Sequence, residues 1–108
     1  MDKLEISIEN LDIEGVKVAL KNGANPNGKD PNESLLHQLA HEYIATKTTA
    51  GDIIIDVALL LINAGTNVNQ IGYNNWRRAI DILLDSNASD FASILIKNGS
   101  TPQQREFI

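Results

Sequence analysis

Cysteine is absent from the 108 residues of this chain. This absence excludes a disulfide scaffold, thiolate chemistry and a zinc site with cysteine ligands, and it fits a reducing compartment. The sequence also lacks an apolar run near the roughly 20 residues that a membrane-spanning helix needs. Residues 1–5, Met-Asp-Lys-Leu-Glu, are too acidic and too polar for a signal peptide. We therefore expect a cytoplasmic protein that does not bind membranes.

Clusters of basic residues are missing as well. The formal net charge is −5, and Arg77 and Arg78 form the only basic pair. Because neutralisation of phosphates dominates affinity for nucleic acids, this composition argues against a nucleic-acid partner. An acidic chain instead suits a protein partner with a basic surface, since opposite charges speed encounter. The simpler alternative is that the acidity only favours solubility.

The two histidines do not form a recognisable metal site. His37 and His41 lie four residues apart on one expected helix, but Gln38 stands where the metalloprotease motif His-Glu-x-x-His has its glutamate. A zinc site needs a third protein ligand, and the chain has no further histidine. We therefore expect no metal. For His41, an exposed role in partner contact or in a pH response stays open.

Signatures of catalysis and of phosphate binding are missing too. The chain has no Gly-x-Ser-x-Gly motif and no third histidine for a triad. Gly72 stands alone rather than in a glycine-rich loop, and Asp81, Asp85 and Asp90 lack the alternating ligands of a calcium loop. We therefore expect no enzymatic activity and no cofactor.

What the sequence does contain is a repeated helix ending. An apolar run followed by glycine and a polar turn occurs at Gly23, Gly65 and Gly99, so the glycines are spaced by 42 and 34 residues. Glycine readily takes the positive φ that commonly ends a helix, because it has no Cβ to clash. A chain that repeats one helix ending at a near-constant period is built by stacking similar units.

Apolar residues at helical spacing predict the helices of these units. Each helix is expected to begin after a capping side chain and to end before a glycine or a corner. We expect helices at residues 3–9, at 13–22 after Asp12, at 34–43 with Ser34 as the cap, and at 52–64 with Asp52 as the cap. Two further helices are expected on either side of a corner at residues 86–90, and Ser89 or Asp90 is expected to cap the second of them. A terminal capping box is expected at residues 101–104.

Residues 34–40, Ser-Leu-Leu-His-Gln-Leu-Ala, resemble the Thr-Pro-Leu-His-x-Ala opening of an ankyrin repeat. Residues 22–27 and 63–69 resemble the ending of that repeat, whereas residues 78–81 are a degraded match to its opening. The resemblance implies an all-α, ankyrin-like solenoid of three helix-turn-helix repeats joined by β-turn fingers. It also implies that His37 ties adjacent turns together by hydrogen bonds.

The repeats divide a single expected domain that spans residues 1–108. Their expected limits are about 1–27, 28–69 and 70–99, followed by a C-terminal cap at 100–108. The 34-residue spacing matches the family's period of about 33 residues, but the 42-residue spacing leaves about nine residues over. We place these in an exposed inserted loop at residues 44–51, which leaves room for a helical extension from Tyr43.

The resemblance implies non-catalytic protein binding at the fingers and on the inner face of the first helices. Trp76 is the only tryptophan, and it lies close to Tyr73 and Arg77; these residue types are enriched at binding hot spots. The alternative for Trp76 is that it packs onto the second repeat. By position, the expected partner-binding residues are Asn27, Lys29, Asp30, Asn32, Glu33, Gln38, His41, Glu42, Gln70, Tyr73, Asn74, Asn75, Trp76 and Arg77.

Small size and acidity favour a monomeric inhibitor, comparable to an immunity protein, that masks a basic partner enzyme. The alternative is an adaptor or a host-directed effector module that bridges two proteins, for which the loop at residues 44–51 would supply a second contact. An inhibitor should hold one partner tightly and abolish its activity, whereas an adaptor should hold two partners at once. An enzyme, the third possibility, would need a deep polar pocket, for which three thin repeats leave little room.

Overall fold

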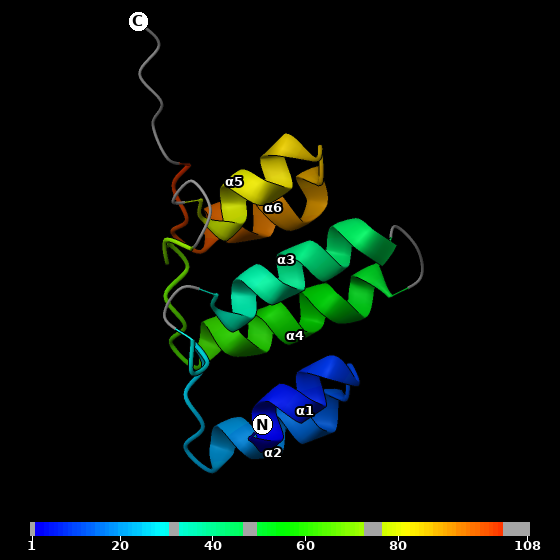
Figure 1. The fold of residues 1–108 in the computed structure, drawn as a ribbon, viewed down its shortest axis with the longest axis vertical. Coiled ribbons are helices and arrows are strands. Elements are labelled where there is room, and N and C mark those ends of the chain that lie inside the picture. The colour runs from blue at the N-terminus through cyan, green and yellow to red at the C-terminus, as the bar shows by residue number, and fades with distance from the viewer. Residues whose placement is uncertain (1, 31–32, 47–49, 73–76, 103–108) are drawn as a thin grey trace, which may run out of the picture.

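The computed structural model describes residues 2–30, 33–46, 50–72 and 77–102, and within these ranges it contains helices but no strand. The all-α prediction is confirmed for this part of the chain, in which no helix is long and apolar enough to cross a bilayer. The helices in Figure 1 are α1 (Lys3–Glu9), α2 (Ile13–Lys21), α3 (Leu35–Thr46), α4 (Gly51–Asn63), α5 (Ala79–Asp85) and α6 (Ser89–Lys97).

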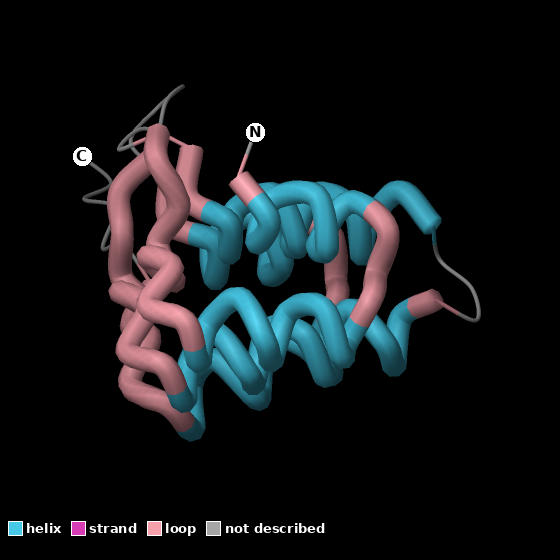
Figure 2. The backbone as a smooth tube through the Cα atoms, turned by 90° about the horizontal axis from the view of Figure 1, so that it is seen from below, coloured by secondary structure: helices cyan, strands magenta, loops and turns pink. Residues whose placement is uncertain are grey.

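The helices form three consecutive pairs, α1–α2, α3–α4 and α5–α6, which are stacked along the longest axis of the molecule (Figure 1). Figure 2 shows the same helices in two rows, with the first helix of each pair in one row and the second helix in the other. Short corners join the two helices of the first and third pairs at one end of the rows. Longer segments gather at the opposite end, and we call their described residues fingers: finger 1 is residues 22–30 and 33–34, finger 2 is residues 64–72 and 77–78, and finger 3 is residues 98–102.

Several predicted helix ends are confirmed where neighbouring residues decide them. Asp12 Oδ1 accepts a hydrogen bond from Gly15 N (3.1 Å), and Ser34 Oγ accepts one from His37 N (3.2 Å). Each side-chain oxygen satisfies an N–H of the first helical turn that has no carbonyl partner. The three predicted glycine ends all have positive φ: Gly23 (93°), Gly65 (98°) and Gly99 (98°).

Two other predicted caps are wrong. The residue before α4 is Ala50, and the residue before α6 is Ala88; neither helix start has a capping side chain. Asp52, Ser89 and Asp90 instead lie inside the first turns of these helices, where a carboxylate still favours the positive end of the helix dipole. Of the capping box predicted at 101–104, residues 103 and 104 lie outside the described residues.

The middle pair is longer than its neighbours. Helix α3 has 12 residues and α4 has 13, compared with 7 in α1 and α5 and 9 in α2 and α6. The loop predicted at residues 44–51 is therefore wrong for 44–46 and 51, which are helical, and the helical extension from Tyr43 is confirmed. Packing explains the extension, because the Tyr43 ring meets the Phe91 ring edge-on at 5.2 Å and Ile44 packs against the core.

One apolar core runs between the two rows of helices, and Ile54, Leu61 and Phe91 are among its fully buried side chains. The packing between successive pairs is uneven. At the first interface, between pairs one and two, α2 packs closely on α4, whereas at the second interface, between pairs two and three, α3 packs closely on α5. Helices α1 and α3 are less closely packed than either of these combinations.

Candidate functional site

Hydrogen bonds between neighbouring fingers hold the finger row together. Asn27 Oδ1 accepts from Asn67 N at 2.6 Å, and the Thr66 hydroxyl lies within hydrogen-bond distance of both Asn27 Oδ1 (3.0 Å) and the Pro26 carbonyl (3.1 Å). Thr66 is buried, so these bonds satisfy a polar group that has little access to water. Asn27, which was expected to bind a partner, thus has its side-chain oxygen committed inside the protein.

The same arrangement recurs between fingers 2 and 3. Asn69 Oδ1 accepts from Thr101 N at 2.8 Å, and the buried Ser100 hydroxyl donates to the Val68 carbonyl at 2.9 Å. The Asn69 amide nitrogen adds a bond to the Gly99 carbonyl at 3.0 Å. Asn69 therefore occupies in finger 2 the role that Asn27 has in finger 1, and the two asparagines register three successive fingers.

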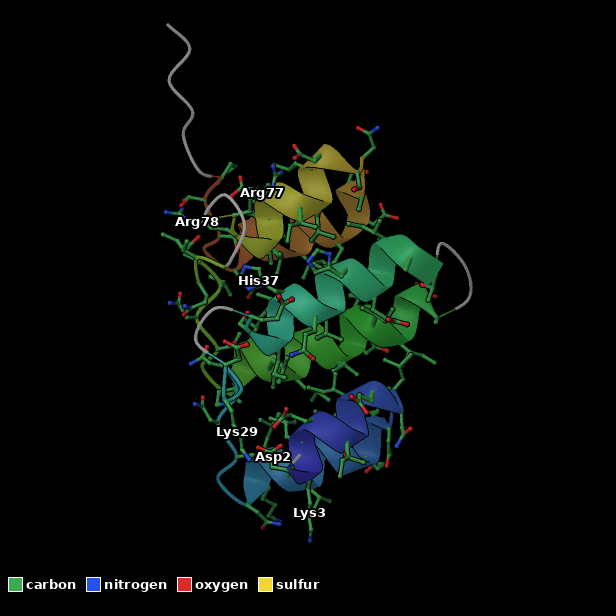
Figure 3. The ribbon with its side chains drawn as sticks, in the orientation of Figure 1. Asp2, Lys3, Lys29, His37, Arg77 and Arg78 are labelled. Atoms are coloured by element: carbon green, nitrogen blue, oxygen red, sulfur yellow. The ribbon has the colours of Figure 1, made fainter. Side chains whose placement is uncertain are left out.

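His37 ties finger 1 and α3 to finger 2. Its Nε2 lies 2.9 Å from the Arg77 carbonyl and its Nδ1 lies 2.7 Å from the Ser34 hydroxyl, while the residue is only 3% exposed. Since a carbonyl can only accept, Nε2 carries the proton and Nδ1 accepts from Ser34. The prediction that His37 links adjacent turns is confirmed (Figure 3). Within the described residues, no group of three potential metal ligands converges.

The basic pair at the end of finger 2, Arg77 and Arg78, is bonded within the protein. The Arg77 guanidinium donates to the Asp81 carbonyl at 3.0 Å and pairs with the Asp85 carboxylate, and its side chain is 20% exposed. Arg78 Nη1 donates to the carbonyl and the hydroxyl of Thr101, both at 2.8 Å. Arg77 was expected to contact a partner, but its guanidinium is bonded to Asp81 and Asp85 of α5.

Four of the expected partner-binding residues surround one open hollow beside finger 1. Asn27, Lys29, Asp30 and Gln70 line it together with Ser34, and its volume is about 320 Å³. Lys29 and Asp30 are exposed, and Figure 3 shows Lys29 on the finger side of the molecule. The fold thus brings residues from two fingers, 40 positions apart in the sequence, to one polar surface.

Three further expected residues, Gln38, His41 and Glu42, are exposed on α3. His41 Nε2 lies 4.0 Å from Glu33 Oε1, so Glu33, also an expected residue, joins this surface. The remaining expected residues lie outside the described residues: Asn32, Tyr73, Asn74, Asn75 and Trp76.

A smaller hollow of about 150 Å³ lies between α1 and α3. Glu9 from α1 lines it together with Gln38 and Glu42 from α3, so it extends the candidate surface onto the first pair. Glu9 was not among the expected residues. A signal was present, because α1 begins at residue 3 and α3 at residue 35, which gives Glu9 the same helical position as His41.

Comparison of the chain with models of protein families, with curated proteins and with solved structures finds no significant match. The candidate site therefore rests on the geometry described above. That geometry is a row of registered fingers beside the exposed face of α3, with two hollows along it.

Proposed function

We propose that this chain is a non-catalytic protein-binding module with ankyrin-like repeats. The observation that carries the proposal is the repeated bond from an asparagine of one finger to the backbone of the next, at Asn27 and at Asn69. These bonds hold three fingers in fixed register, so a partner would meet a surface that loses little conformational entropy on binding. Lys29, Gln38 and His41, which were expected by position to bind a partner, are exposed on that surface.

The proposed partner is a cytoplasmic protein with a basic surface. The chain has a net charge of −5, and both of its adjacent arginines are bonded within the protein. Acidic side chains without a partner in the described part of the chain, such as Glu9 and Glu42, are therefore left to determine the field near α1 and α3. We propose that a monomer masks such a partner as an inhibitor or immunity protein does, with a bridging adaptor as the alternative.

The test compares two triple variants in capture of partners from the source cell, with identification by mass spectrometry. The surface variant carries Lys29→Ala, Gln38→Ala and His41→Ala; the control carries Asp52→Ala, Asp56→Ala and Ser93→Ala, three exposed positions on α4 and α6. We expect one near-stoichiometric basic protein that the surface variant loses and the control retains. Loss of its activity on binding would mark an inhibitor, and simultaneous capture of two proteins would mark an adaptor. Equal capture by both variants would contradict the proposed surface.

A further inference from the structure

The hollow between α1 and α3 exists because the first interface is formed mainly by the second helix of each pair, α2 and α4. Helix α2 packs on α4 there, and α1 stays farther from α3 than α5 does. The space between them is about 150 Å³, comparable to a cavity that accommodates a benzene molecule. A slot of this size takes one side chain of a partner rather than a folded segment.

The floor of this slot is apolar. Ile8 and Leu39 are 5% and 1% exposed, and Leu11 completes the lining. Leu11 has φ of 50°, a conformation that is uncommon for a bulky residue, whereas the matching corner of the third pair has Asn87 at φ of 58°. Asparagine suits that backbone better than leucine does, so the first corner keeps an apolar side chain in spite of its backbone preference.

The rim of the slot is polar and acidic, in contrast to its apolar floor. Glu9, Gln38 and Glu42 are exposed, and their side chains have no hydrogen bond or ion pair within the described residues. Two exposed carboxylates on the other helix of the first pair are engaged, Glu14 with Lys17 and Asp12 with Gly15 N. Two uncommitted carboxylates and one amide oxygen thus stand over an apolar floor.

We propose that this slot receives one arginine side chain of the partner protein. Arginine has an aliphatic stem that can lie on Ile8, Leu11 and Leu39 and a charged head that can stay at the rim. Its five N–H donors, in a fixed fork, can reach several acceptors at once, whereas lysine presents a single point charge. This inference rests on the proposed protein-binding function, and it names the anchor residue by which a basic partner would be recognised.

The experiment titrates the ¹⁵N-labelled full chain with an end-capped Gly-Arg-Gly peptide and, separately, with matched peptides that contain lysine or norleucine. We expect amide shifts confined to residues of α1 and α3 that line the slot, with a dissociation constant on the order of millimolar and weaker binding of lysine. The norleucine peptide should leave the spectrum unchanged. Equal shifts with norleucine, shifts scattered over the chain, or concentration-dependent shifts without peptide would overturn the slot.

Charge-matched variants separate the slot from general acidity. Glu9→Gln with Glu42→Gln and Asp52→Asn with Asp56→Asn each remove two negative charges at exposed positions. We expect the first pair to weaken the arginine peptide about three- to tenfold and the second to leave it unchanged. Equal weakening by both would overturn the slot. If the slot fails while Lys29→Ala, Gln38→Ala and His41→Ala still abolish partner capture, the proposed function stands and only the anchor is wrong.

Discussion

At both interfaces between successive helix pairs, equivalent hydrogen bonds join the fingers, but different helices pack against each other. Asn27 and Asn69 make equivalent contacts with the next finger, so the finger row is nearly regular. The second interface adds the His37–Arg77 bond and the Tyr43–Phe91 ring contact, and it closes through α3 and α5. In the described part of the chain, no hydrogen bond or ring contact links α1 to α3 at the first interface, and the slot beside Glu9 and Glu42 lies between these two helices.

This difference suggests that the second interface serves stability and the first interface serves recognition of a partner. The second interface stabilises the stack by burying polar and aromatic groups with their partners satisfied. The first interface is held through α2 and α4 and leaves side chains on α1 and α3 without partners. The open interface is therefore where we place recognition, and the closed one is where we expect substitutions to cost the most stability.

The largest effect should follow Phe91→Ala. Phe91 is fully buried and contacts Tyr43 across the second interface, so the substitution leaves a large cavity. We expect the free energy of unfolding to fall by about 3–5 kcal/mol, measured by urea denaturation. Ile96→Ala, at a half-exposed position of the same helix, is the control and should change it by about 1 kcal/mol or less. Equal losses would show that the second interface is not specially dependent on this ring.

His37→Ala should have the next largest effect. The substitution removes the bond to the Arg77 carbonyl and leaves the buried Ser34 hydroxyl without its histidine partner. We expect a loss of about 1–3 kcal/mol in thermal or urea unfolding. His41→Ala, at an exposed position one turn later, should stay within about 0.5 kcal/mol. A His37 variant as stable as the His41 variant would remove the polar contribution that distinguishes the second interface.

The two finger asparagines test the regular part of the comparison. Asn27→Ala and Asn69→Ala each remove the acceptor of a backbone N–H in the next finger. We expect each to lower stability by about 1–2 kcal/mol and to speed amide hydrogen exchange at Asn67 or Thr101 respectively. Asn63→Ala, at an exposed position at the end of α4, is the control. Strongly unequal losses of stability in the two variants would mean that the bonds between successive fingers are not equivalent.

The smallest effect on stability is expected at the rim of the slot. Glu9→Gln with Glu42→Gln should change the free energy of unfolding by no more than about 0.5 kcal/mol, because neither side chain has a partner in the described part of the chain. Urea denaturation at matched ionic strength measures this. A loss well above that value would give these carboxylates a structural role and would weaken the contrast between an open and a closed interface.

Much of the helical framework could be predicted from short-range patterns. The glycine ends at Gly23, Gly65 and Gly99 and the caps at Asp12 and Ser34 depend on residues within one turn of each helix end, so a local motif suffices. The starts of α4 and α6 could not be predicted in this way. They follow Ala50 and Ala88, which carry no capping side chain, and their positions depend on packing within and between the pairs.

The candidate site was predictable only in part. Residues chosen from α3 are exposed as expected, because helical spacing separates the buried face from the open one. Arg77 was chosen for its residue type, and no local pattern shows that Asp85, eight positions later, would pair with it. Glu9 was missed because its significance depends on how far α1 stands from α3, which is a property of the interface rather than of either helix.

Backbone preferences and apolar spacing over a few residues were enough to predict the helices of the described residues and most of their ends. The role of His37 in linking adjacent turns came only from the resemblance of residues 34–40 to a known repeat opening. Local patterns did not show that the extra residues of the middle pair lengthen both α3 and α4, or that one interface closes through the first helices and the other through the second. Such packing depends on side chains like Tyr43 and Phe91, which are distant in sequence and meet only when the pairs stack.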